Sequence, residues 1–487
     1  MKLRQTIAVF TLALSGLLAS AAQKPNIVLF VADDFGRGSI NALGADEKFV
    51  KTPHLNKLVE SGINFTNAFT TASVCTPTRY AMLTGQYSWR TNLKKGVVNN
   101  SDPLLISTKT ETIGKMLQKQ GYRTAAVGKW HLGYKSKQFK DLLGTIKPGP
   151  IDVGFNYHFG VPNNLDDLHK VYIENDHIYG LRSDKIQAWG KSFYGDQPYK
   201  GYDAPQRKCD EVMDFTTEKA IAWMTDKKKD KPFFLYFGAA AVHHPITPSA
   251  RMKGTSGAGL YGDFIHDIDY SVGQFMKALK ENGLDKNTLF IFTSDNGGDI
   301  PENKTWPEYE AYKMGFNFNG KNSGDKHTIY EGGLKVPFIV SWPGKIASSK
   351  SSTELVTTVD LFSTFSELLT GKLPEVKVAA PDSFSFYHIL MNHQEKSSRP
   401  SLVHRDAPGR QAFRKGKWKL IDNYFPENGN KKGKTRGNKM LFDLSLDPLE
   451  QKNVIKLFPE VAQALEKELN TIRQNPSSRR LSLGQSR

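Results

Sequence analysis

Five short apolar runs constrain the fold of this chain more than any other feature of its sequence. Apolar residues, mostly Val, Ile, Leu, Phe and Ala, stand at consecutive positions within each run, which is typical of strands buried on both faces. The segments between several of these runs carry apolar residues at helical spacing. The runs are NIVLFVADD, RTAAVGKW, KPFFLYFGAAAV, NTLFIFTSDNG and VPFIVSWPG. The alternation predicts an α/β fold, with a mixed, mostly parallel sheet sandwiched by helices.

The pattern changes near residue 400. From there SLVHRD, GRQAFRKGKWKLI and KMLFDLS indicate short antiparallel strands, and FPEVAQALEKELNTIRQN indicates a closing amphipathic helix. We therefore predict a main domain over residues 23–400 and a smaller C-terminal α+β subdomain over 401–487. The basic segment 427–439 is expected to be a solvated loop between two strands of that subdomain.

The N-terminus has the layout of a secretory signal peptide over residues 1–22. Lys2 and Arg4 precede an apolar run, which ends in small residues with cleavage expected after Ala21 or Ala22. No segment is long and apolar enough for a membrane span, so we expect an exported protein, periplasmic or secreted. An exported protein has little reason to meet nucleic acid. The formal charge of +17 then indicates either polyanionic partners outside the cytoplasm or only solubility.

Polar residues follow four of the apolar runs at the point where each predicted strand ends. Any one of them could be an ordinary strand-end cap or turn. In an open α/β sheet, however, the carboxyl ends of parallel strands form one edge, where ligands bind. Three carboxylates and an amide at that edge would make an all-oxygen site for Ca²⁺ or Mg²⁺. The residues are Asp33, Asp34, Lys129, His131, His243, His244, Asp295 and Asn296.

Cationic side chains are expected at the same edge. Arg79, Lys129, Lys326 and the histidines would face the metal, which makes sense only if an anion sits among them. A tetrahedral oxyanion ester would balance these charges, because cationic groups stabilise the charge that develops during its cleavage.

The chain has only two cysteines, Cys75 and Cys209. Cys75 could be a buried apolar residue, or it could form a disulfide with Cys209. The stretch Thr76 to Arg79 is polar and turn-forming, which favours an exposed loop leading into a helix and leaves a chemical role open. Cys209 opens a predicted helix and is expected to be structural.

The stretch around the first cysteine, CTPTRYAMLTGQY, resembles the signature of the type I sulfatases, C-x-P-x-R followed by a helix carrying L-T-G. In that family the cysteine is oxidised to formylglycine, whose hydrated aldehyde supplies the nucleophilic oxygen. The resemblance implies an alkaline-phosphatase-like fold, with 23–400 as the catalytic domain. It also implies that Cys75 is a precursor and that a formylglycine-generating or anaerobic sulfatase-maturing enzyme is a partner, reading Pro77 and Arg79.

Other motifs extend the resemblance over nearly the whole mature chain. VADDFGRG and TSDNGG resemble the two metal-binding motifs, so Asp33, Asp34, Asp295, Asn296 and matured Cys75 would hold Ca²⁺, with Mg²⁺ as the alternative. GKWHLG places Lys129 and His131 in the sulfate pocket. AVHHPITP points to His243 rather than His244. KHTIYEGGLKVP assigns Lys326 to a sulfate oxygen, and the spacing to Glu331 favours it over Lys321.

The resemblance also implies a mechanism. An oxygen of the hydrated formylglycine attacks sulfur in line, and Arg79 helps to hold the hydrated aldehyde. His243 protonates the leaving oxygen, and the charge of Lys326 assists. His131 helps to deprotonate the second hydroxyl, which collapses the sulfo-enzyme and regenerates the aldehyde.

The substrate expected from the resemblance is a sulfated polysaccharide or its oligosaccharides. PGPIDVGFNYHFGVPNN and VYIENDHIYGL look like the subgroup that acts on 6-sulfated galactose or N-acetylgalactosamine. Candidate sugar contacts are Asn163, Asn164, Asp166 and His177.

Two alternatives remain from the sequence. The first is a phosphomonoesterase or phosphonate hydrolase of the same superfamily. Those relatives more often use two metal ions and a Ser or Thr nucleophile, so Cys75 counts against this alternative. The second is a non-catalytic protein that binds sulfated glycans by its basic surface, which would leave the metal motifs without a purpose.

Overall fold

The computed structural model describes residues 23–193, 197–226, 230–422 and 438–482. The predicted signal peptide and nearly all of the basic segment 427–439 lie outside the described residues. Among the described helices, none combines the length and the apolar character that a membrane crossing would require.

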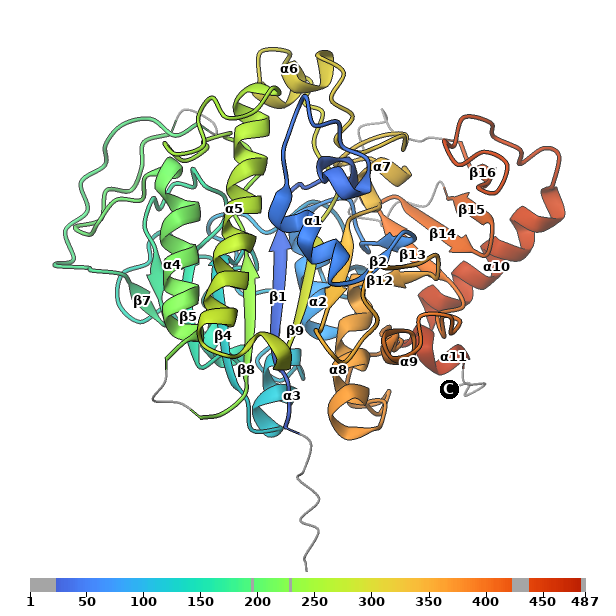
Figure 1. Ribbon diagram of the computed structural model, residues 1–487, viewed down its shortest axis with the longest axis horizontal. Helices are drawn as coiled ribbons and strands as arrows, with labels where there is room; N and C mark the ends of the chain where they lie inside the picture. The colour runs from blue at the N-terminus through green and yellow to red at the C-terminus, as the bar shows by residue number, and fades with distance from the viewer. Residues whose placement is uncertain (1–22, 194–196, 227–229, 423–437, 483–487) are drawn as a thin grey trace, which may run out of the picture.

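A ten-stranded sheet forms the centre of the molecule (Figure 1). The five apolar runs form β1, β4, β8, β9 and β10, as predicted. Strands β9, β1, β8, β4 and β5 are parallel, whereas β10 runs antiparallel to both of its neighbours, so the sheet is mixed. In spatial order the strands are β11 (Lys350–Ser352), β2 (Gly62–Phe65), β10 (Phe338–Ser341), β9 (Thr288–Ser294), β1 (Asn26–Ala32), β8 (Phe233–Gly238), β4 (Arg123–Lys129), β5 (Tyr157–Val161), β6 (Ile173–Glu174) and β7 (His177–Ile178).

Helices cover both faces of this sheet. Alternate residues of β1 belong to two separate hydrophobic cores, which explains why the run is apolar at every position. Helices α1, α4 and α5 contribute to one core and lie in front of the sheet in Figure 1, while α2, α3, α8 and α9 contribute to the other. The helices are α1 (Pro53–Glu60), α2 (Cys75–Thr84), α3 (Ile113–Lys119), α4 (Val212–Met224), α5 (Gly259–Glu281), α6 (Pro307–Lys313), α7 (Glu331–Leu334), α8 (Leu361–Thr370), α9 (Tyr387–Met391), α10 (Pro459–Gln474) and α11 (Ser478–Ser482).

A four-stranded antiparallel sheet forms the C-terminal part, at the right of Figure 1, and α10 packs on its strands β14 and β15. This antiparallel sheet with a closing helix was predicted. The hydrophobic core of this C-terminal part also includes a residue of α2. Ala81 of α2 belongs to the same hydrophobic cluster as Phe413 and Leu469. The boundary at residue 400 stays a prediction. The strands are β13 (Leu402–Arg405), β14 (Gln411–Lys415), β15 (Trp418–Ile421) and β16 (Met440–Asp443); β3 (Ala68–Phe69) and β12 (Val356–Thr357) pair separately.

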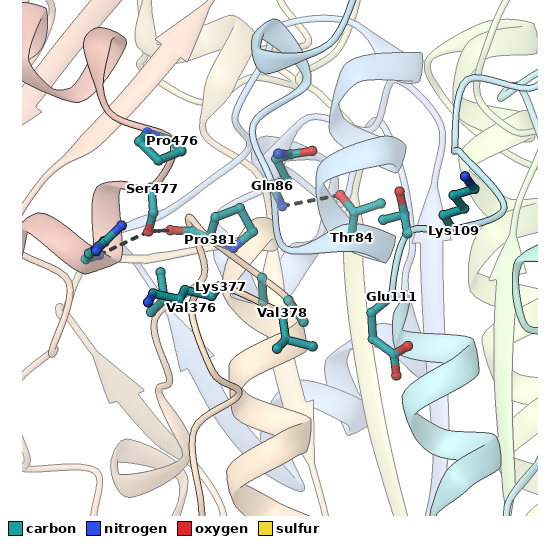
Figure 2. A pocket seen from close by; sticks show the side chains of 14 residues that line it. Thr84, Gln86, Lys109, Glu111, Val376, Lys377, Val378, Pro381, Pro476 and Ser477 are labelled. Carbon is teal, nitrogen blue, oxygen red and sulfur yellow. Dashed lines mark hydrogen bonds between the residues drawn. The ribbon is translucent and has the colours of Figure 1, made fainter. Parts of the chain in front are cut away.

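A cavity of about 450 Å³ lies where the end of α2 meets segments from the C-terminal half (Figure 2). Thr84 and Gln86 line it on one side, and Pro381 and Ser477 line it on the other. Each predicted site residue lies in the described part of the chain, and none of them lines this cavity. It is at the opposite end of α2 from Cys75, which begins that helix.

Candidate active site and metal site

The ends of neighbouring parallel strands bring the predicted acidic residues together. Strand β1 lies between β9 and β8, so the chain at the carboxyl end of β1 forms backbone hydrogen bonds with the chain at the carboxyl ends of β8 and β9. The amide of Asp33 donates to the carbonyl of Ala241 at 2.9 Å, and that of Asp295 donates to the carbonyl of Ala32 at 3.2 Å. Asp34 has a φ of 57°, which turns the chain sharply away from the strand direction.

The resulting cluster offers oxygen ligands in a buried position. One ligand atom each from Asp33, Asp34, Asp295 and Cys75 lie within 4.8 Å of one another. The side-chain oxygen of Asn296 is buried and accepts no hydrogen bond from any described residue, although the Asn296 amide group donates to Asp34 Oδ1 at 2.7 Å. Carboxylates with an unused amide oxygen are the donor set of a hard divalent cation, so these residues fit one.

Burial has a strong effect on the acidic group nearest the centre. It raises the pKa of Asp33 to about 8, although Lys129 opposes the shift. Burial thus disfavours the charged form of the Asp33 carboxyl, and additional positive charge in the cluster would favour that form. A bound dication would supply that charge and favour the carboxylate.

Cys75 begins α2 and is 2% exposed, so the expectation of an exposed loop was wrong. Its polar neighbours satisfy their hydroxyls inside the protein: Thr76 donates to the carbonyl of His131 at 2.9 Å and Thr78 to that of Ala72 at 3.1 Å. The polar residues that follow Cys75 are therefore buried and hydrogen-bonded rather than exposed to solvent. Burial also raises the pKa of the Cys75 thiol.

The alternative that Cys75 forms a disulfide with Cys209 is also wrong, because both cysteines are free. Cys209 lies just before α4, and its sulfur is 3.0 Å from Lys170 Nζ and 3.4 Å from the carbonyl of Leu165. It therefore lies in a short helical turn and packs against the segment around residues 165–170, as a structural residue would.

Arg79, one turn into α2, lies against the carboxylates with an exposed fraction of zero. Its Nε and Nη2 contact Asp295 Oδ2 at 2.9 and 2.7 Å, and Nη2 is 3.5 Å from Asp33 Oδ1. Its Nη1 donates to the carbonyl of Lys129 at 3.1 Å and to the hydroxyl of Tyr236 at 3.2 Å. A glycine in β8 leaves the room for this, since a Cβ on Gly238 would stand 2.9 Å from Nη1.

Two lysines complete the charge balance. Lys129 Nζ lies 2.6 Å from Asp33 Oδ2 and 3.7 Å from Cys75 Sγ, and Lys326 Nζ lies 2.6 Å from Asp34 Oδ2. Burial alone would raise the pKa of Asp34, but Lys326 and Lys129 hold that pKa below its usual value. The rival Lys321 is exposed. Three buried carboxylates and three buried cations thus meet at one edge, an arrangement in which a cation and an anion together would keep the charges balanced.

The two predicted histidines are buried beside this cluster. His131 Nε2 lies 3.1 Å from the carbonyl of Val98, and His243 Nδ1 lies 2.5 Å from the carbonyl of His244. Because a carbonyl can only accept, these nitrogens carry the protons in those bonds. The other His243 nitrogen, Nε2, is 3.8 Å from Asp34 Oδ2. Burial and the nearby Lys129 lower the pKa of both imidazoles, so both remain neutral near pH 7.

The candidate sugar contacts are more scattered, and their roles stay predictions. Asn163 Nδ2 donates to Asn100 Oδ1 at 2.9 Å. Asn164 is half-buried, and its backbone carbonyl accepts a hydrogen bond from Arg207 Nη2. Asp166 accepts the Tyr199 hydroxyl at 2.7 Å, whereas His177 is exposed at the edge of the sheet on β7.

The sequence did not single out a group of side chains beside His243. His244 Nδ1 lies 2.7 Å from Glu308 Oε1, and its ring stacks on that of Trp306 at a centroid distance of 3.6 Å. Phe193 packs on the same imidazole. No local motif marks these residues, because they come from three distant segments; only the doubled histidine in AVHHP gave a signal.

Comparisons with known proteins agree with this geometry. A sequence model of the sulfatase family matches residues 25–372, and a model described as "N-sulphoglucosamine sulphohydrolase, C-terminal" matches residues 322–475. An N-acetylgalactosamine-6-O-sulfatase of Bacteroides thetaiotaomicron is 34% identical, with 93% of this chain and 94% of that protein covered.

Solved structures give the same result. A structure from the work on metabolism of multiple glycosaminoglycans by Bacteroides thetaiotaomicron has a TM-score of 0.83 and 34% identity, and it covers 93% of this chain and 100% of the other. A phosphonate monoester hydrolase of Agrobacterium radiobacter has a TM-score of 0.61 at 17% identity, with 92% and 95% covered, and shares the fold alone. The predicted alkaline-phosphatase-like fold is therefore confirmed.

Proposed function

This chain belongs to the sulfatase family, and on that premise we propose that it hydrolyses 6-O-sulfate esters of galactose or N-acetylgalactosamine in a sulfated polysaccharide or its oligosaccharides. The family assignment makes the protein a sulfuric ester hydrolase rather than a phosphomonoesterase or a non-catalytic glycan-binding protein. The sugar is supported by the 34% identity to a sulfatase named for N-acetylgalactosamine 6-sulfate over nearly the whole of both chains.

A single observation carries the proposal at the level of the site. Asp33, Asp34 and Asp295 meet Lys129 and Lys326, together with Arg79, at the buried edge where Cys75 begins α2. A monoanionic sulfate ester bound together with a divalent cation would change the net charge of this cluster by only one positive charge. We propose Ca²⁺ as that cation, held by Asp33, Asp34, Asp295 and Asn296. When bound, it would polarise the sulfate and neutralise charge that develops on it.

The remaining residues can be given roles from their positions. Lys129 and Lys326 each contact one carboxylate of the cluster, and their ammonium groups would bind oxygens of a sulfate ester beside those carboxylates. Asp34 holds the pKa of Lys326 well above its usual value in spite of burial, and Lys326 therefore stays cationic. His243 would transfer a proton at Nε2 to the leaving alcohol from its imidazolium form, because Nδ1 holds the single proton of the neutral ring; the negative charge of a bound sulfate ester would favour that form. His131 would accept a proton at Nδ1, which is buried without a hydrogen-bond partner among the described residues.

Cys75 stands for the precursor of the nucleophile. As formylglycine, position 75 would supply a hydrated aldehyde with two hydroxyls, one to attack and one to regenerate the aldehyde. We further propose that the protein is exported to the periplasm or medium, and that a maturing enzyme of the host converts Cys75.

The intact mass of the tryptic peptide containing Cys75 tests this proposal, in protein made by its native host. Conversion of cysteine to formylglycine lowers the mass by about 18 Da, and we expect that species together with activity on 6-sulfated galactose-type sugars. Cys75→Ala serves as the matched control, because it removes the precursor and little volume. Unmodified Cys75 in active wild-type protein would overturn the mechanism, and cleavage of only uronic acid or glucosamine sulfates would overturn the proposed substrate.

A further inference from the structure

Three aromatic rings form a cluster beside the predicted catalytic histidine. The rings of His244 and Trp306 are stacked at 3.6 Å and 17°, and Phe193 packs on both, at 4.4 Å from His244 and 5.5 Å from Trp306. We call Phe193, His244 and Trp306 the aromatic cluster. His244 directly follows His243, whose Nε2 lies 3.8 Å from Asp34 Oδ2, so the cluster adjoins the sulfate pocket.

Each ring of the aromatic cluster is held by a separate polar contact or helix. His244 is fixed by Glu308 Oε1, which lies 2.7 Å from Nδ1 and is itself buried. Trp306 immediately precedes α6, which packs against α5 and sits at the top of Figure 1, beyond the carboxyl ends of the strands. Phe193 donates its backbone amide to Asp166 Oδ2 at 2.6 Å. The cluster is therefore preorganised, although its members come from distant parts of the sequence.

The cluster presents an apolar surface to solvent. The Phe193 side chain is 43% exposed and Trp306 is half-buried, while His244 is only 5% exposed beneath them. Exposed aromatic rings next to a cluster of buried charges are a common composition of ligand sites: apolar walls with a few polar groups that fix orientation.

We propose that the aromatic cluster is the subsite for the sugar ring that carries the sulfate, an inference that rests on the proposed function. A galactose-type ring has an axial 4-hydroxyl, so the C–H groups at positions 3, 4 and 5 form a continuous apolar face. Phe193 and Trp306 offer rings for that face to pack on, while the 6-sulfate reaches the charged pocket beside His243.

The proposal also gives Asp166 a role different from a direct sugar contact. Its carboxylate already accepts from the Tyr199 hydroxyl and the Phe193 amide, and Lys170 pairs with it as well. Asp166 is therefore a positioning residue for the segment that presents Phe193.

Steady-state kinetics of Phe193→Ala on a 6-sulfated N-acetylgalactosamine oligosaccharide test the proposal. We expect KM to rise about tenfold, because the packing surface is lost, with a much smaller change in the inhibition constant of inorganic sulfate, which occupies only the charged pocket. Phe193→Tyr keeps the ring and should restore KM. Tyr312→Ala is the matched control, since Tyr312 is equally exposed at 43% and lies on α6.

The outcomes separate this inference from the function on which it rests. Wild-type protein that cleaves no 6-sulfated galactose-type sugar would overturn the proposed function. Wild-type protein that cleaves it, together with an unchanged KM in Phe193→Ala or an equal rise in Tyr312→Ala, would overturn the aromatic subsite alone. Melting temperatures of all variants identify any that fail to fold.

Discussion

Arg79 connects more parts of the site than any other single residue described above. It contacts Asp295 with two nitrogens, approaches Asp33, and bonds the end of β4 through the carbonyl of Lys129. Its guanidinium is wholly buried and is the cation that contacts Asp295 directly, whereas Asp33 is also paired with Lys129.

Removal of that charge should destabilise the protein strongly. We expect Arg79→Met to lower the free energy of unfolding by about 3–5 kcal/mol, because it leaves Asp295 buried without its cation. Tyr236→Phe is the control, since it removes only one neutral hydrogen-bond partner of the guanidinium and should cost about 1 kcal/mol. Urea denaturation measures both, and similar losses in the two variants would contradict the central role of the ion pair.

For single residues, the sequence predicts the location of side chains that directly follow strands better than the contacts between side chains that are distant in the sequence. Asp33, Asp34, Asp295 and Asn296 could be placed together because the carboxyl ends of parallel strands share an edge. The burial of Cys75 could not be predicted, because its polar neighbours bond to backbone carbonyls that only the fold brings close. The aromatic cluster was missed for a similar reason.

At the scale of elements, the short helix α7 links Lys326 to the C-terminal sheet. Glu331 begins α7 and is buried against Arg414 of β14 at 2.9 Å and Lys419 of β15 at 3.2 Å. Lys419 also contacts Glu450 at 2.6 Å. The segment that carries Lys326 is thus anchored by two strands of the other sheet.

These contacts of Glu331 should make the free energy of unfolding decrease at acidic pH. Burial opposes ionisation of Glu331, but Arg414 and Lys419 lower its pKa from 4.5 to about 2. The unfolded chain binds this proton more readily, so the contribution of Glu331 is complete above pH 4.5 and is lost as the pH falls through 2.

We therefore expect the melting temperature of the wild type to fall more steeply between pH 4.5 and 2 than that of Glu331→Gln. Glu468→Gln is the matched control, because Glu468 pairs with Lys415 of β14 at the surface and such pairs contribute about 0–1 kcal/mol. Parallel acid profiles for the wild type and Glu331→Gln would show that the buried pair does not govern this dependence.

Elements were predicted where apolar residues run without interruption. The five apolar runs became strands, but β2, β6, β7 and β11 are short or partly exposed and carry no such signal. The direction of β10 could not be read either, because a strand buried on both faces has the same pattern whether it is parallel or antiparallel.

At the scale of the whole molecule, the C-terminal sheet supports the segment that leads into Cys75. The amide of Arg405 donates to the carbonyl of Thr71 at 3.0 Å, and the amide of Ser73 donates back to the carbonyl of Arg405 at 3.1 Å. The segment before α7 joins them, since the amide of His327 donates to the carbonyl of Ser73 at 2.9 Å. The two predicted domains therefore meet beside Cys75.

A chain that ends at residue 400 should consequently fail to fold. It would lose the strand that pairs with residues 71–73 and would expose Phe69, Tyr87 and Trp89, which are buried against the C-terminal sheet and α10. We expect residues 23–400 to accumulate as insoluble protein, whereas residues 23–487 remain soluble; sedimentation and far-UV circular dichroism report both. A soluble, folded 23–400 fragment would show that the main domain is independent.

The burial of Cys75 bears on whether its proposed modification would occur before or after folding. The proposed maturing enzyme would have to reach Cys75, Pro77 and Arg79, and all three are buried in a helix of the folded protein. On the proposed mechanism, conversion of Cys75 would therefore have to precede folding. A chain that folded first would keep its thiol and would remain a folded but inactive protein.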